Sequence, residues 1–372
     1  METQNPSVPT LVSGMKSSPN VACLDASCSS IDDVKQAIDV AGAVIVENSV
    51  LSARRQPQGE VFYSNVEHRA SAAHFISVCD VIFESRKPLL VLAGNYDLHS
   101  ELGGGLSESE LQRLHALIWP YVDQPISRTQ VLDGPYFEAW MDRLLDPLEN
   151  WKRITSLVPV QIEYTHMLAP TEIRMPMRRK IWDTAVPGVQ YVTRRIARQS
   201  AKEAGLSIAP TAILDNAVER VTRNAIKFRP LSGPGHRARF YLRRENMLRL
   251  LGLSGSAFVC GAGYEYLVRK FLEVPALGVP MIAFPVDGLA KLGFEPNVHY
   301  VATDPESFGY EAASISQDDV RRSRISRAGQ TLVAQLHTTN TRIADLVHVT
   351  SATVAGSAEG GRFMGGRLRS LD

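Results

Sequence analysis

The residue types best suited to chemistry lie between Ser254 and Phe284. A loop containing Gly261 and Gly263 precedes an expected helix, and the free N–H groups at a helix N-terminus suit a phosphate. Arg269 and Lys270, in the same helix, add cationic donors. This segment predicts a phosphate-binding turn, although many glycine loops before helices bind no phosphate. It is not a Walker loop, because no Gly-Lys-Ser/Thr follows.

Two acidic residues of the same segment, Glu265 and Glu273, stand eight positions apart. On a helix this spacing is a rise of about 12 Å, so the pair could touch two parts of one extended ligand. Carboxylates are good acceptors for vicinal sugar hydroxyls. Glu273 also lies among apolar residues, and a buried acid needs partners. The alternative is a pair of solvated glutamates on a helix surface.

Further candidates lie outside this segment. Asp97 and His99 follow an expected strand and could orient an acceptor hydroxyl or act as a base, although a plain polar turn is the alternative. His236 lies in a Gly/Pro loop with two arginines. That loop is either on the phosphate side of a site or simply on the surface.

Alternating strands and helices must position these residues. In the first half, strands are expected at 41–47, 80–83 and 88–93, with helices at 65–78 and 106–119; Ser107 and Glu110 suit the start of the second helix. In the second half, strands are expected at 187–192, 257–260, 279–284 and 299–302, with helices at 194–204, 245–253, 265–277, 318–336 and 338–347. This order predicts an α/β protein with parallel sheets and ligands at the carboxyl ends of the strands.

Length and composition limit the kinds of protein that this chain can be. The 372 residues suggest two domains, and the net charge of +1 gives no general electrostatic case for binding nucleic acid. The four cysteines show no zinc spacing, no metal-ligand cluster is visible, and no apolar run reaches the roughly 18–20 residues of a membrane span. We therefore expect a cytoplasmic protein without a transmembrane segment. The expected order is a disordered arm (1–20), an N-terminal domain (21–170), a C-terminal domain (171–350) and a flexible tail (351–372).

Three stretches resemble one known family. The run VRKFLEVPALGVPMIAF resembles the C-terminal domain of GT-B glycosyltransferases of the group 1 type. In that pattern two glutamates separated by seven residues precede small-x-Gly-x-Pro, and the matching residues are Glu265, Glu273, Ala276, Gly278 and Pro280. The run ISRAGQTLVAQLHTTNTRIADLV is similar to the end of the CgeB-like subgroup, with matches at Ala328, Gly329, His337, Thr338 and Arg342. VPGVQYVTRR resembles the opening of the domain, so the likeness spans roughly 185–348.

The resemblance implies the GT-B fold, with two Rossmann-like domains whose parallel sheets face a central crevice. The implied enzyme moves a sugar from a UDP- or GDP-linked donor to a glycan, lipid or small-molecule acceptor. It needs neither a metal nor another cofactor, and it retains the anomeric configuration. Two other functions stay open: a GT-B-type sugar-nucleotide epimerase or hydrolase, and a degenerate domain that does not catalyse.

The resemblance also implies roles for single residues. Glu273 would hold the ribose hydroxyls, while Glu265, Gly263 and Tyr264 would meet the sugar and the diphosphate. Arg194 or Arg195 would neutralise the departing diphosphate, which is the main electrostatic task of this chemistry. The family pattern has Gly directly after the first glutamate, where this chain has Tyr266.

Overall fold

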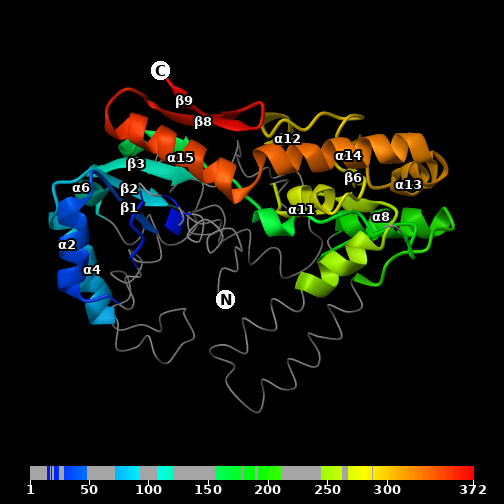
Figure 1. Ribbon diagram of the computed structural model, residues 1–372, viewed down its shortest axis with the longest axis horizontal. Coiled ribbons are helices and arrows are strands. Elements are labelled where there is room, and N and C mark those ends of the chain that lie inside the picture. Colours follow the sequence, from blue (N-terminus) through cyan, green and yellow to red (C-terminus); the bar gives the residue numbers. More distant parts are fainter. Residues whose placement is uncertain are drawn as a thin grey trace, which may run out of the picture. The chain divides into compact units, whose positions relative to one another are not determined.

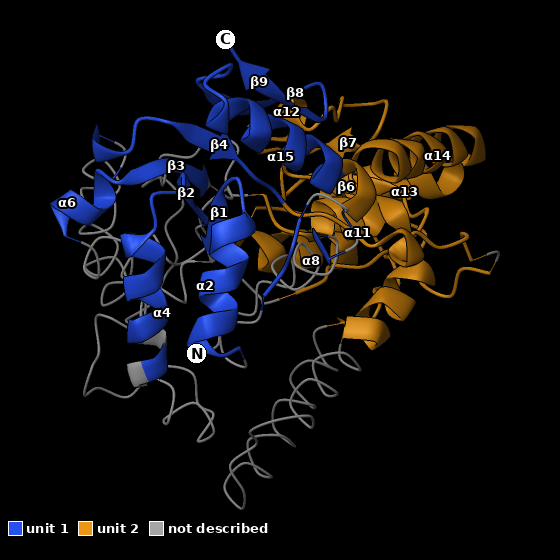
Figure 2. Cartoon of the chain, turned by 60° about the vertical axis from the view of Figure 1, so that its left-hand side comes forward, with its two compact units in different colours: residues 1–125, 134–165, 342–372 blue, residues 126–133, 166–341 orange. Residues whose placement is uncertain are grey.

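The computed structural model describes the greater part of the chain (Figure 1). The described residues are 15–16, 18, 21–24, 29–47, 72–92, 107–119, 154, 156–177, 179–188, 192–211, 244–261, 267–286 and 288–372. They fall into two compact units (Figure 2). Among them, unit 1 comprises the residues before 166 and those from 342 onward, and unit 2 comprises 166–341.

Unit 1 contains a six-stranded sheet with the order β1-β2-β3-β4-β8-β9. Its strands are β1 (Val44–Glu47), β2 (Leu89–Leu92), β3 (Leu114–Trp119), β4 (Gln161–Glu163), β8 (Gly360–Met364) and β9 (Arg367–Leu371). The pairs from β1 to β8 are parallel, and β9 closes the sheet as the antiparallel partner of β8. The sheet is thus completed by strands from both ends of the chain.

The helices of unit 1 are α2 (Ile31–Val40), α4 (Ala72–Glu84), α6 (Glu108–Leu111) and most of α15 (Thr339–Val354). α2 packs beside α4, and buried side chains of both helices join those of β2 in one core. α6 begins with a capping box in which Ser107 and Glu110 hold each other's backbone N–H groups, as the sequence predicted. Figure 1 shows α15 running beside the β8–β9 hairpin.

Unit 2 contains a parallel sheet of β5 (Ala257–Val259), β6 (Met281–Ala283) and β7 (Val301–Ala302). Single parallel bridges add 182–185 beside β5 and Ile208 beyond it, which extends the sheet. Its helices are η4 (Pro170–Glu172), α8 (Val192–Glu203), 244–252, α11 (Lys270–Ala276), α12 (Gly288–Lys291), α13 (Phe308–Gln317) and α14 (Asp319–Leu336). A separate core of buried residues from these strands and helices holds unit 2 together.

The predicted α/β class with parallel sheets is confirmed, and most expected strands of the second half form. Two expectations in unit 1 are wrong. Residues 80–83 belong to helix α4, because a short apolar run fits a buried helix as well as a strand. The helix expected at 106–119 stops at Leu111, and Leu114–Trp119 is the central strand β3. In that strand Leu114, Ala116, Leu117 and Ile118 are all buried, so no alternation marks it in the sequence.

The C-terminal tail also differs from expectation. Residues 360–364 and 367–371 form β8 and β9 instead of a flexible tail, and α15 runs to Val354. Phe363 and Leu368 are buried on the inner side of this hairpin, and they supply the apolar contacts that a Gly- and Arg-rich composition conceals. Residues 1–14 of the expected disordered arm lie outside the described residues. Within the described parts of the chain, no helix combines the length and apolarity needed to cross a membrane.

Candidate functional site

The candidate site lies in unit 2, where neighbouring parallel segments end. The segment 182–185 leads into a loop containing Gly188 and then into α8, and β5 leads into Cys260 and Gly261. Loops at the carboxyl ends of adjacent parallel strands are where open α/β sheets bind ligands. The same end of unit 2 carries the start of α11.

Gly188 lets two cationic side chains approach the first of these loops. Its φ is +95°, a conformation that favours glycine, and a Cβ added there would lie 2.8 Å from Nη1 of Arg194 and 3.2 Å from Cε of Lys270. Arg194 lies in the first turn of α8, and Lys270 is the first residue of α11. Two of the predicted donor-binding cations therefore meet at one glycine.

Arg194 is held in place by its surroundings. It is buried, and its side chain hydrogen-bonds that of Cys260. Burial raises the pKa of the Cys260 thiol, and the positive charges of Arg194 and Lys270 offset only part of that rise. Arg195, the other predicted candidate, is exposed. Of the two arginines, Arg194 is thus the one directed at the Gly188 loop.

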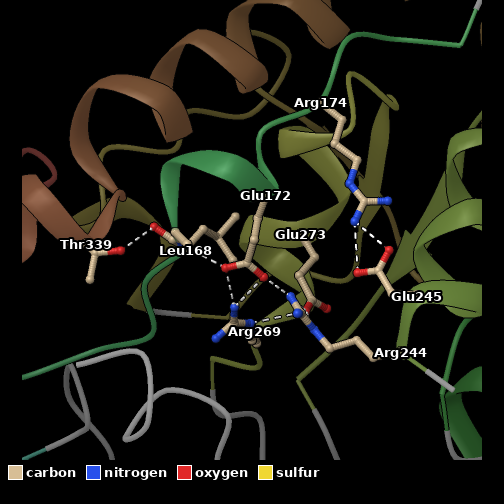
Figure 3. A network of polar contacts seen from close by, with 9 residues as sticks. Leu168, Glu172, Arg174, Arg244, Glu245, Arg269, Glu273 and Thr339 are labelled. Carbon is tan, nitrogen blue, oxygen red and sulfur yellow. Dashed lines mark hydrogen bonds and ion pairs between the residues drawn. The ribbon is translucent and has the colours of Figure 1, made fainter. Parts of the chain in front are cut away.

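Two arginines and two glutamates form a network in which Arg269 and Glu273 are buried and Arg244 and Glu172 are partly buried (Figure 3). Arg269 donates from Nη2 to both oxygens of Glu172, at 2.8 and 2.7 Å, and from Nε to Oε1 of Glu273, at 3.1 Å. Arg244 donates from Nε and Nη2 to the same Oε1, both at 3.1 Å, and it also pairs with Glu172. Three separate segments, η4, the helix at 244–252 and α11, are thereby tied together.

The network leaves Glu273 with one occupied oxygen. Both arginines donate to Oε1, and no donor from the described residues reaches Oε2. The side chain is only 5% exposed, so the arginines supply the partners that its burial requires. Glu273 is thus a carboxylate oriented through Oε1, whose Oε2 has no donor among the described residues.

Glu172 completes the charge balance of the network. Burial by itself raises the pKa of Glu172, but the charges of Arg269 and Arg244 outweigh it, and hydrogen bonds to Arg244 and the Ala169 N–H add to the effect. The net result is a lowered pKa, so Glu172 is ionised near neutral pH. Two carboxylates then face two guanidinium groups, and the network carries no net charge.

His166 lies beside the same cations. Burial, followed by the charge of Arg269, lowers the pKa of His166 to about 3, despite a hydrogen bond to the backbone of Leu267. Its imidazole is therefore neutral near pH 7 and adds no positive charge. Among the described residues, no group of three His, Cys, Asp or Glu side chains is placed to hold a metal ion.

The structure describes five of the predicted site residues. Arg269 and Glu273 meet in the network, Arg194 and Lys270 meet at Gly188, and Arg195 is exposed. Six predicted residues lie outside the described part of the chain: Asp97, His99, His236, Gly263, Tyr264 and Glu265.

Two members of the network, Glu172 and Arg244, were missed in the sequence. Glu172 lies 72 positions before Arg244 and 97 before Arg269, and such pairings leave no local pattern. Arg269, expected to offer an open phosphate donor, instead donates to two carboxylates.

Comparisons with known proteins agree with the predicted family likeness of the second half. Residues 235–348 match a family model described as glycosyl transferase-like. This match includes Arg244, Arg269 and Glu273, whereas Glu172 and Arg194 lie outside it. A search of curated proteins found no match.

Several solved structures are distantly similar. Anabaena HepE in complex with UDP-glucose has a TM-score of 0.44 at 11% identity, covering 86% of this chain and 94% of that one. Sucrose-phosphate synthase from Thermosynechococcus elongatus has a TM-score of 0.38 at 10% identity, covering 92% and 83%. A putative UDP-N-acetylglucosamine 2-epimerase from Listeria monocytogenes has a TM-score of 0.36 at 11% identity, covering 95% and 94%. Similarities this distant assign no site residue.

Proposed function

Because residues 235–348 match a glycosyl transferase-like family model, we propose that this chain transfers a sugar from a nucleotide-diphosphate sugar to an acceptor hydroxyl. The donor binds at the carboxyl end of the sheet in unit 2. The acceptor is a glycan, a lipid or a small molecule.

The observation that carries this proposal is the orientation of Glu273. Two arginines fix its Oε1, and no donor among the described residues reaches its Oε2. A ribose presents two adjacent hydroxyls, which donate well to one carboxylate. The arginines hold the carboxylate still, so little side-chain freedom is lost when the nucleoside binds.

The cations at Gly188 supply the second half of the donor site. The diphosphate gains charge as the sugar departs, and positioned cationic donors stabilise that charge. Arg194 and Lys270 are placed for this task, and a phosphate oxygen is a stronger acceptor for Arg194 than the thiol of Cys260. We propose that these cations, rather than a metal ion, neutralise the leaving group, and that the sugar is transferred with retention, as the resemblance of the Glu265/Glu273 pattern to group 1 GT-B transferases implies.

Nucleotide binding by the full chain tests the donor site. Thermal denaturation is followed with UDP, GDP, ADP, dTDP and CMP and with their sugar derivatives. A ligand at 100 times its dissociation constant adds about 2.7 kcal/mol to the stability of the folded chain. We expect a rise in melting temperature with one base, and no rise with any of them would contradict the proposal.

Variants of Glu273 locate the bound nucleotide. Glu273→Gln keeps an oxygen for the arginines but removes the charge, and Glu273→Ala removes the whole acceptor. We expect both to weaken nucleotide binding more than tenfold, a loss of about 1.4 kcal/mol or more. Glu245→Ala is the matched control, because Glu245 pairs with Arg174 outside the network. Circular dichroism checks the fold, and unchanged affinity in folded Glu273→Gln would remove Glu273 from the site.

Turnover separates transfer from the other activities. With the donor sugar identified, transfer requires an acceptor, whereas a hydrolase or an epimerase consumes the donor alone. We expect activity to persist in EDTA and the product to keep the anomeric configuration of the donor. Loss of activity in EDTA, restored by a divalent cation, would contradict the assignment of charge neutralisation to Arg194 and Lys270.

A further inference from the structure

The β8–β9 hairpin of unit 1 carries an uncompensated group of positive charges. Arg362 on β8 lies directly opposite Arg369 on β9, and both are exposed. Neither makes an ion pair within the part of the chain that the structure describes. Like charges directly opposite each other on paired strands destabilise a hairpin. Two arginines at these positions therefore favour an anionic partner outside the chain.

The hairpin is firmly anchored on its other contacts. The buried carboxylate of Glu163 accepts the Phe363 N–H at 2.7 Å, and the guanidinium of Arg342 lies 4.3 Å from the centre of the Phe363 ring. Asp345 of α15 pairs with Arg367 and also accepts the Leu368 N–H at 3.3 Å. These contacts hold the strands against α15, so Arg362 and Arg369 are presented from a fixed backbone (Figure 1).

A cavity of about 350 Å³ lies along β9 and α15 next to Arg369. His348, Arg367, Arg369 and Ser370 line it, together with Asp345, whose charge is already taken up by Arg367. The Ser370 hydroxyl is buried and makes no hydrogen bond within the described residues. Cationic and neutral donors thus predominate around this hollow. The acidic residues Glu359 and Asp372 stand beyond the open end of the hairpin.

We propose that the hairpin binds a phosphate group through Arg362 and Arg369, of which Arg369 also lines this cavity. A phosphate accepts two parallel hydrogen bonds from each guanidinium and relieves the repulsion between the two arginines. The chemistry is the same for a soluble phosphate ester and for the headgroup of an anionic lipid. This site belongs to unit 1 and does not depend on the proposed donor site in unit 2.

Binding assays with two kinds of probe test the proposal and separate the sources. Inorganic phosphate and glycerol phosphate are titrated calorimetrically into the full chain. Vesicles of phosphatidylcholine, with and without phosphatidic acid, are tested by flotation. We expect binding to at least one of these phosphate probes, weakened by added salt. Binding of the soluble probes alone identifies a free phosphate ester, and binding of the phosphatidic acid vesicles alone identifies a lipid headgroup.

A charge-matched pair of double variants assigns the binding to the hairpin. Arg362→Gln/Arg369→Gln removes the two charges, and Arg324→Gln/Arg327→Gln removes two exposed charges from α14 of unit 2. The proposed donor site in unit 2 can also bind phosphate. Binding is therefore assigned to the hairpin only if it is lost in Arg362→Gln/Arg369→Gln and retained in Arg324→Gln/Arg327→Gln. We expect that loss to be at least about tenfold, the effect of roughly 1.4 kcal/mol. Equal binding by both variants, or no binding of any probe by the wild type, would overturn the proposal.

Discussion

At the scale of single residues, the candidate site depends on opposite charges that are buried together. Arg244, Arg269, Glu172 and Glu273 are each little exposed, and each has partners of opposite sign. Removing one member leaves another charge buried without a partner, which costs more than the pair itself contributes. We therefore expect the substitution of any one member to lower the free energy of unfolding.

Glu172 gives the first prediction. Glu172→Gln leaves Arg269 without its bidentate carboxylate, and we expect the free energy of unfolding to fall by about 3 kcal/mol. Urea denaturation followed by circular dichroism measures the change. Glu245→Gln, in the more exposed pair with Arg174, is the control and should cost less than about 1 kcal/mol. Equal losses of unfolding free energy in the two variants would show that the network stabilises the fold no more than the more exposed pair of Arg174 and Glu245.

The acid sensitivity of the fold follows from His166. Unfolded, His166 takes up a proton near pH 6.5, whereas in the folded chain it does so only near pH 3. The unfolded chain thus binds more protons between these values, and stability falls as the pH drops, by up to about 1.4 kcal/mol per pH unit. Glu172 has a lowered pKa, so its contribution is lost only at more acid pH, below its ordinary value of 4.5.

His166→Gln tests this sensitivity. Between pH 6.5 and 4.5, where Glu172 keeps its charge, the unfolding free energy of the variant should fall less steeply with decreasing pH than that of the wild type. Urea midpoints at several pH values give the slope. A slope as steep as that of the wild type would mean that His166 is not the group responsible.

Part of this candidate site could be proposed from the sequence. Glu273 stood out as an acid among apolar residues, and Lys270 as a cation in a helix that follows a glycine loop. Glu172 and Arg244 carried none, since their partners lie far along the chain and only folding brings them together. The burial of Arg269 between two carboxylates was equally invisible, because a lone arginine in a sequence shows no partner.

At the scale of elements, the packing of α13 on α8 depends on the absence of a side chain at Gly309. A Cβ there would lie 2.2 Å from the carbonyl oxygen of Ser200. The Ser200 hydroxyl in turn accepts the Gly309 N–H at 2.9 Å. The two helices therefore touch backbone to backbone, and one of them, α8, carries Arg194.

Gly309→Ala should force these helices apart. Overpacking of this kind costs about 1–3 kcal/mol, and we expect the free energy of unfolding to fall by that amount. Gly42→Ala is the control, because a Cβ at Gly42 would meet nothing within 4 Å. Thermal or urea denaturation of the two variants gives the comparison, and similar stabilities would contradict the close approach.

The prediction of an element was right where its hydrophobic pattern fitted only a strand or only a helix. It was wrong where the pattern fitted both. The runs at 44–47 and 89–92 are short and largely apolar, the first of them β-branched, and they are strands. Leu111, Leu114, Leu117 and Ile118 fitted a helical face, yet the last three lie in a central strand covered on both faces. Hydrophobic spacing alone cannot separate such a strand from a buried helix.

At the scale of the whole molecule, the two units should respond differently to a donor. Every residue assigned here to nucleotide binding belongs to unit 2. Hydrogen exchange of the full chain with a saturating nucleotide should therefore show added protection in peptides covering 186–200 and 257–283. Peptides from β1 to β3 should exchange unchanged. Protection confined to unit 1 would place the nucleotide elsewhere.

The return of the chain to unit 1 has a consequence for its synthesis. A ribosome delivers β1 to β4 first, then all of unit 2, and only afterwards the β8 strand that pairs with β4. For that interval the nascent chain exposes one open edge of a half-built sheet, and open edges pair readily with other chains. We therefore expect unit 2 to fold while the sheet of unit 1 is still incomplete, with the edge of β4 left unpaired until β8 is synthesised.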